Sequence, residues 1–90
     1  MGKLEEFAKR VVQKYLDRKF PLDRAFAKAK TRVYKAISEY EDRIDEIVDR
    51  FNGKPPEEWQ KHIGELTHRK VEERNFLSEI EDLEASGWPN

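Results

Sequence analysis

Apolar residues recur at alternating steps of four and three along the middle of the chain, and only Lys30 interrupts the series. The members of this series, called the seam below, are Phe26, Val33, Ile37, Tyr40, Ile44, Ile47 and Phe51. Heptad spacing places them on one face of an α-helix and is typical of coiled-coil-like packing. Pro21 marks the start, because the residue before a proline avoids helical angles and proline suits a first helical turn. The pattern predicts a helix over residues 21–51.

A tight turn is predicted after this helix. Asn52-Gly53 suits the left-handed conformation that ends many helices, and Pro55-Pro56 favours the start of another. The apolar residues that follow predict a helix over residues 56–85, and they are Trp59, Ile63, Leu66, Phe76, Leu77, Ile80 and Leu83. The turn makes the two helices antiparallel. It sets three expected pairs of neighbours: Phe51 with Trp59, Ile44 with Ile63, and Phe26 with Ile80.

A shorter amphipathic helix is predicted over residues 3–19. Its apolar face follows the i, i+3, i+4, i+7 pattern and consists of Leu4, Phe7, Ala8, Val11, Val12, Tyr15 and Leu16. We expect it to lie beside the first half of the 21–51 helix and the second half of the 56–85 helix. The predicted fold is all-α, a three-helix chain in the order short-long-long whose antiparallel hairpin is coiled-coil-like or part of a helical bundle. Residues 1–85 would form one helical domain, followed by a tail of residues 86–90.

The turn end of the hairpin is expected to be two helices thick, because the 3–19 helix is too short to cover it. Such a stretch buries little apolar surface unless another chain covers it. We therefore expect self-association, with a homodimer favoured. The expected function is a small interaction or assembly module, such as an adaptor or an inhibitor of a larger protein complex. The expected interface residues are Tyr40, Ile44, Ile47, Phe51, Trp59 and the tail residue Trp88.

Length and composition narrow the functional classes. A chain of 90 residues is one domain at most, and the absence of cysteine excludes disulfides, thiolate catalysis and cysteine-based zinc sites. No apolar run approaches the roughly 18 residues of a membrane span, and the first residues lack the apolar stretch of a secretory signal. The expectation is a soluble cytoplasmic protein with no membrane partner.

Charge is abundant but segregated along the chain. Residues 1–36 contain 11 basic and 4 acidic side chains, whereas residues 37–90 contain 7 basic and 15 acidic ones. The face of the 21–51 helix opposite the seam changes sign midway. Its basic half, called the basic stripe, consists of Arg24, Lys28, Arg32 and Lys35, and its acidic half of Glu39, Asp42, Glu46 and Asp49.

Three interpretations of this segregation remain open. The basic half can pack beside the acidic 56–85 helix through surface ion pairs. An antiparallel second copy centred near Ile37 can instead lay its acidic half on the basic stripe. Nucleic acid is the alternative partner, although the isoelectric point of about 6.1 weakens that hypothesis. Its candidate contacts are Lys3, Lys9, Arg10, Lys14, Arg24, Lys28, Arg32 and Lys35.

The sequence contains no recognisable catalytic constellation. His62 and His68 are six residues apart and therefore lie on different faces of a helix. Glu65 and His68 match one element of a di-iron carboxylate site, but such sites need a second element on a facing helix. The serines lack a glycine-rich nucleophile loop. We therefore expect no enzyme, no metal, no cofactor and no small-molecule substrate.

The polar middle of the 56–85 helix, from Thr67 to Asn75, allows two outcomes. Lys70, Glu73 and Arg74 can form a buried polar layer that fixes the alignment of the helices. Alternatively, the helix rolls there and exposes these side chains.

Overall fold

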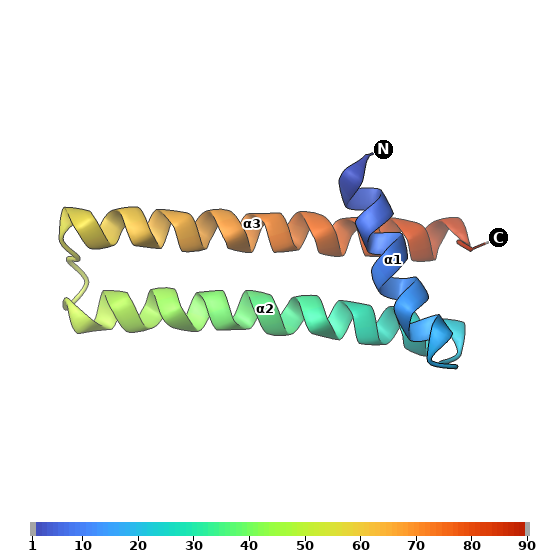
Figure 1. The fold of residues 1–90 in the computed structure, drawn as a ribbon. Coiled ribbons are helices and arrows are strands. Elements are labelled where there is room, and N and C mark those ends of the chain that lie inside the picture. The colour runs from blue at the N-terminus through green and yellow to red at the C-terminus, as the bar shows by residue number, and fades with distance from the viewer. Residues whose placement is uncertain (1, 90) are drawn as a thin grey trace.

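The computed structural model describes residues 2–89 and consists of three α-helices (Figure 1). Helix α1 spans Lys3–Asp17, α2 spans Leu22–Arg50 and α3 spans Glu57–Ser86, and these described residues form no strand. Helices α2 and α3 form a long antiparallel hairpin, and α1 crosses the end that carries the chain termini. We call that end the base and the α2–α3 turn the tip. The predicted all-α hairpin in the order short-long-long is confirmed.

The helix boundaries differ from the predicted ones by at most two residues, and the backbone explains where each helix ends. Helix α1 stops at Asp17 because Lys19 adopts a left-handed φ of 71°. The turn after α2 contains Asn52 and Gly53, whose φ values are 53° and 83°. Gly87, with a φ of 82°, ends α3 in the same way. Glycine adopts this conformation without a steric penalty, so the helix stops predicted from Gly53 and Gly87 follow from its chemistry.

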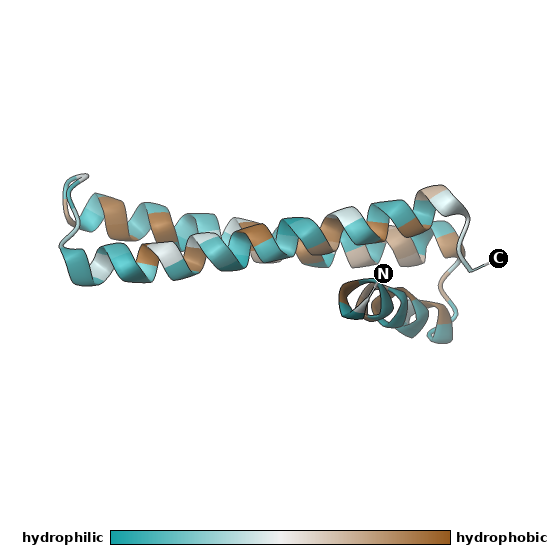
Figure 2. Cartoon of the chain, turned by 90° about the horizontal axis from the view of Figure 1, so that it is seen from above, coloured by the Kyte–Doolittle hydropathy of each residue, from teal (hydrophilic) through white to brown (hydrophobic). Residues whose placement is uncertain are grey.

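The apolar core lies at the base, where all three helices meet. Figure 2 shows α1 as a separate layer on one side of the two long helices. The buried cluster takes residues from every helix and consists of Ala8, Val11, Val12, Ala25, Phe26, Ala29, Val33, Ile37, Phe76, Ile80 and Leu83. As expected, α1 therefore packs on the first half of α2 and the second half of α3. Within residues 2–89, no helix is long and apolar enough to cross a bilayer.

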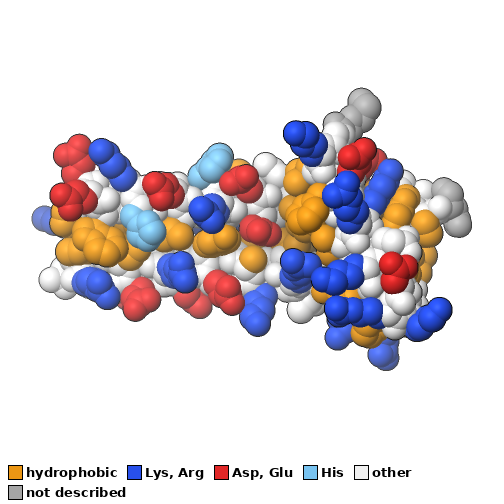
Figure 3. Space-filling view, in the orientation of Figure 1, with side chains coloured by type: hydrophobic (Ala, Val, Ile, Leu, Met, Phe, Trp, Pro, Cys, Tyr) orange, Lys and Arg blue, Asp and Glu red, His pale blue; other side chains and the backbone are white. Residues whose placement is uncertain are grey.

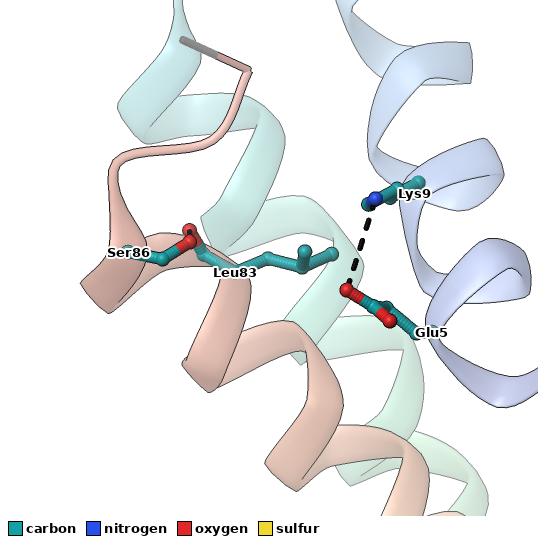
Figure 4. Close-up of polar contacts among 4 residues, drawn as sticks. All are labelled: Glu5, Lys9, Leu83 and Ser86. Carbon is teal, nitrogen blue, oxygen red and sulfur yellow. Dashed lines mark hydrogen bonds and ion pairs between the residues drawn. The ribbon is translucent and has the colours of Figure 1, made fainter. Parts of the chain in front are cut away.

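Apolar packing supplies the contact between α1 and the end of α3. Figure 4 shows the Leu83 side chain pointing from α3 toward α1, near Glu5 and Lys9. Lys9 Nζ lies 3.7 Å from Glu5 Oε1 within α1. Ser86 Oγ donates a 2.9 Å hydrogen bond to the Leu83 carbonyl within α3, where a helix end leaves carbonyls without backbone partners. Both polar contacts stay inside one helix, whereas Leu83 belongs to the buried cluster that also contains Ala8, Val11 and Val12 of α1.

The ring contacts define the register of the hairpin. At the tip, the Phe51 and Trp59 ring centroids are 5.6 Å apart, which confirms the expected pair. At the base, Phe26 and Ile80 belong to the same buried cluster. Trp88 meets Phe26 edge-on at 6.4 Å. This candidate interface residue therefore already packs on the core of its own chain.

Lys30, the residue that interrupts the seam, is half-buried and reaches across to α3. Its Nζ lies 2.7 Å from Glu84 Oε1. The hydrogen bond that Lys30 donates to Glu84 raises the pKa of Lys30 above its ordinary value of 10.5, against the opposing effect of burial. A lysine is thus accommodated in an apolar series because its ammonium group has a carboxylate partner beside the core.

This pair predicts a pH-dependent contribution to stability. A lysine whose pKa is raised in the folded state stabilises the fold fully at pH values below its ordinary pKa. This stabilisation is lost as the pH rises through the raised pKa. We expect Glu84→Gln to lower the free energy of unfolding at pH 9 by under about 1 kcal/mol, because the pair is partly exposed. The difference from the parent should shrink above pH 10.5 in a series of thermal unfolding experiments. Asp82→Asn, a neighbouring exposed site, serves as the control, and a Glu84→Gln difference that stays constant with pH would contradict the assignment.

The polar middle of α3 does not form a buried layer. None of the polar or charged side chains in the described part of the chain is buried. Lys70 and Glu73 are half-buried, while Arg74 is exposed and lies 4.0 Å from Glu41 of α2. The buried polar layer expected as one outcome is therefore absent from the described residues, and of the three side chains only Arg74 is exposed as the other outcome expected.

Candidate functional site

The tip half of the hairpin, residues 38–75, extends beyond the three-helix core and is two helices thick (Figure 1). Only Ile47 and Leu66 are buried in this stretch. The other apolar residues between the two helices are half-buried, and they are Tyr40, Ile44, Val48, Phe51, Trp59 and Ile63. Figure 3 shows hydrophobic side chains exposed between α2 and α3, on the face that carries α1. We call this surface the tip strip.

An aromatic cluster ends the tip strip at the turn. Trp59 contacts the Phe51 ring and also meets the His62 ring at 5.9 Å. The Arg50 guanidinium lies 6.0 Å from the centroid of the Trp59 ring. Trp59 thus has neighbours from both helices but remains half-buried, as does Phe51. Half-buried aromatic side chains flanked by an arginine are the composition found at the centres of protein interfaces.

A cleft lies where the tip strip meets α1. Leu4, Phe7 and Val11 of α1 form one wall, and Ala36 of α2 and Phe76 of α3 form the floor. The Phe7 ring stacks on Phe76 at 5.1 Å yet remains 50% exposed. The polar rim of the cleft consists of Glu72, Glu73 and Arg32, and Arg32 also belongs to the basic stripe. Glu72 and Glu73 also line a neighbouring hollow beside Tyr40, His68 and Arg69. The two hollows continue the tip strip up to the side of α1.

A second surface, a groove on the outer side of α2, contains the whole basic stripe. The groove is lined by Tyr15 of α1 and by Arg24, Ala27, Lys28, Thr31, Arg32 and Lys35 of α2. All four cations are exposed, and within residues 2–89 none of them forms an ion pair with a carboxylate. Figure 3 shows blue side chains gathered where α1 meets α2. We call this surface the basic groove.

Three acidic side chains on α1 and in the first turn of α2 contact groups other than the stripe cations. Glu5 lies beside Lys9. Asp17 accepts a 2.9 Å hydrogen bond from Gln13. Asp23 accepts one of the same length from the backbone N–H of Arg24, at the start of α2. In the part of the chain that the structure describes, no carboxylate lies within ion-pair distance of the four stripe cations.

The ion pairs weigh against the hypothesis that the basic half simply packs on acidic α3. Between residues 2–36 and α3, the described residues form only one ion pair, between Lys30 and Glu84. Lys30 is not part of the basic stripe. The stripe faces away from α3 because it lies opposite the seam. Its charges therefore remain available to a binding partner.

The remaining nucleic-acid candidates are not gathered into the basic groove. Lys3, Arg10 and Lys14 are exposed on α1, and Lys3 and Arg10 flank Phe7. Lys9 is half-buried beside Glu5. The structure thus divides the eight predicted contacts into a compact group of four on α2 and a separate group on α1.

The sequence analysis did not single out Phe7 or Tyr15 as functional residues. Both were assigned to the apolar face of the first helix, and periodicity indicates only which side of a helix is apolar. How far the hairpin covers that side depends on the angle at which α1 crosses it. The sequence carried no signal for Phe7 or Tyr15, because seven apolar residues over about four turns is the ordinary number for one face of an amphipathic helix.

The Glu65 and His68 side chains do not form a metal site. His62 Nδ1 lies 4.0 Å from Glu65, whereas His68 Nε2 lies 3.5 Å from Glu72. In the described residues, no group of three or more His, Cys, Asp or Glu side chains is arranged to hold a metal ion. Both histidines have a carboxylate neighbour on their own helix, which is typical of a solvated surface.

Comparison with protein-family models, curated proteins and solved structures found no match to this chain.

Proposed function

We propose that this chain is a small helical interaction module, of the adaptor or inhibitor type, that associates with itself through the tip strip. One observation carries the proposal: the hairpin extends well past the three-helix core, and most of its apolar residues there are only half-buried. A stretch two helices thick gains little from burial on its own, and a covering partner supplies the missing apolar contact.

The base and the tip differ in how completely they are packed, although both use the same seam. At the base, α1 completes the packing, and seam residues such as Phe26 and Val33 are almost wholly buried. At the tip, Tyr40, Ile44 and Phe51 continue the series without a third helix above them. The seam is therefore apolar beyond the length that one chain can bury, which supports a partner at the tip.

The two isoleucines of the tip provide the test. Ile47 is 8% exposed within one chain, so Ile47→Ala should cost about 2–4 kcal/mol of unfolding free energy at any protein concentration. Ile44 is half-buried, so Ile44→Ala should cost less in the monomer and act mainly by weakening association. Sedimentation equilibrium should give the parent protein a mass above 10.8 kDa that rises with concentration. Ile44→Ala should shift this rise to higher concentration.

A matched control for Ile44→Ala is Val71→Ala, because Val71 is an exposed apolar residue of the same half of the hairpin. It should change neither the mass nor the thermal midpoint. A parent protein that remains monomeric at every concentration would contradict self-association. An Ile47→Ala variant as stable as the parent would contradict the packing of the tip.

Nucleic acid is a second candidate partner, and the basic groove is the observation that favours it. Four exposed cations, which form no ion pair within residues 2–89, follow one helix over 11 residues, which is about 16 Å, with Thr31 as an additional hydrogen-bond donor. One of them, Lys28, lies 5.4 Å from the centroid of the Phe20 ring. Cations in such a row can contact successive phosphates, and their binding releases counterions. Binding to generic duplex and single-stranded DNA over a series of salt concentrations tests this candidate.

A further inference from the structure

Helix α1 gives the molecule a stepped shape. It covers one face of the hairpin at the base and leaves the same face of the tip bare (Figures 1 and 2). Beyond the buried cluster, α2 continues for about 20 Å and α3 for about 28 Å. An α-helix with its side chains is about 10–12 Å wide. The bare part of the face therefore has room for one more helix laid across the hairpin as α1 is.

Basic residues are in excess on α1, and carboxylates are in excess around the hollow on the uncovered part of the hairpin face. Residues 3–19, which include α1, contain 6 basic and 3 acidic side chains. On the bare part of the face, the hollow beside Tyr40 is lined by three carboxylates and two cations, and these are Glu65, Glu72, Glu73, Lys61 and Arg69. The outward side of α1 in one molecule would thus be attracted to the tip of another, and repelled by a second α1.

Both surfaces also offer apolar area for the contact. On α1, Phe7 and Leu4 remain exposed beside the cleft. On the tip, the half-buried Tyr40 lies in a hollow that continues toward Phe7 through Glu72 and Glu73. The outer face of α2, the rival surface for a charge-matched pair, offers Tyr15 and Ala27 as the apolar lining of its groove, whereas the tip strip offers Ile44, Phe51 and Trp59 beside Tyr40. A stable interface needs an apolar centre, so the face that carries α1 is the better candidate.

We propose that two copies of this chain pair antiparallel through the faces that carry α1, so that α1 of each copy lies on the bare tip of the other. This inference rests on the proposed self-association and specifies its geometry. A two-fold axis makes the contact occur twice, because each molecule supplies one α1 helix and one uncovered tip. Basic residues of α1 then lie over the carboxylates that line the hollow, and Phe7 enters the apolar strip beside Tyr40.

Cysteine cross-linking can test this geometry, because the chain contains no cysteine and each variant would carry a single thiol. Three exposed, uncharged or weakly charged positions mark the three surfaces. Gln13→Cys marks the outward side of α1, His62→Cys marks the tip beside Trp59, and Ser38→Cys marks the middle of the outer face of α2. Each variant is first checked for parental helix content by circular dichroism and for parental mass by sedimentation.

An equimolar mixture of Gln13→Cys and His62→Cys, treated with a short bis-maleimide, should give the mixed dimer as its main product. Each variant alone should give little dimer. A dominant His62→Cys homodimer would show tip-to-tip pairing, and a dominant Ser38→Cys homodimer would show pairing through the outer face of α2. Either result would overturn the proposed geometry while leaving self-association intact. A parent protein that sediments as a monomer would overturn both proposals.

Discussion

Phe26→Ala is expected to lower the free energy of unfolding by about 3–5 kcal/mol, the range for removal of a large aromatic side chain from a core. Phe26 is 2% exposed and lies in the cluster where all three helices meet. It also holds the Trp88 ring against the core. Small domains are stable by about 5–15 kcal/mol in total, so a loss of this size would leave much of the variant unfolded at 37 °C.

Leu22→Ala is the control for Phe26→Ala, because Leu22 lies one turn earlier on α2 and is 41% exposed. Its loss should stay within about 0.5 kcal/mol in urea unfolding. The two tryptophans lie at opposite ends of the molecule, so a Trp59→Phe background leaves Trp88 as the only fluorescent reporter of the base. Phe26→Ala should shift its emission to longer wavelength. Equal stability of the Phe26 and Leu22 variants would contradict the position of the core.

The sequence predicted the helices and the hairpin because these depend on short-range chemistry. Heptad spacing determined which face of α2 is apolar, and Asn52-Gly53 provided the left-handed residues that end the helix. A tight turn then left one antiparallel register, in which Phe51 meets Trp59. Such features are encoded within a few residues of each other, so a single sequence is enough to derive them.

The candidate surfaces were only partly predictable. Spacing placed Arg24, Lys28, Arg32 and Lys35 on one face of α2, but it did not show whether acidic α3 would neutralise them. That depends on the rotation of α2 about its axis, which burial of the seam determines. The same limit applies to Phe7, which was assigned to the apolar face of α1 and is half-exposed because of the crossing angle of that helix.

The basic groove predicts the largest change in ligand affinity. If its four cations each contact a phosphate, the affinity of the parent protein for duplex DNA should fall about 10²-fold between 50 and 200 mM salt, since each contact adds about 0.9 to the slope of log K against log salt. Replacing all four cations with glutamine should remove about 3.6 from that slope and lower the affinity at 50 mM salt by at least about 10²-fold.

A matched control removes the same number of positive charges away from the groove. Its four exposed sites lie on the tip half of the hairpin and are Arg43, Lys54, Lys61 and Arg69. Glutamine at these positions lowers the net charge by the same amount, so a general attraction to DNA would weaken equally in both variants. A contact in the groove would weaken only in the groove variant, and equal losses would contradict nucleic-acid binding at this site.

The groove variant also distinguishes the two ways in which a second copy can dock. In a dimer through the outer face of α2, the basic stripe lies on the acidic Glu39–Asp49 half of the partner copy, so its neutralisation should lower the sedimenting mass. Arg32 also lines the cleft beside Phe7, so the mass is compared for a variant that neutralises only Arg24, Lys28 and Lys35. In the dimer through the faces that carry α1, these three residues lie outside the contact, and the mass should stay at the parental value. We expect lost DNA affinity together with unchanged mass, because these three cations line the basic groove and not the cleft beside Phe7.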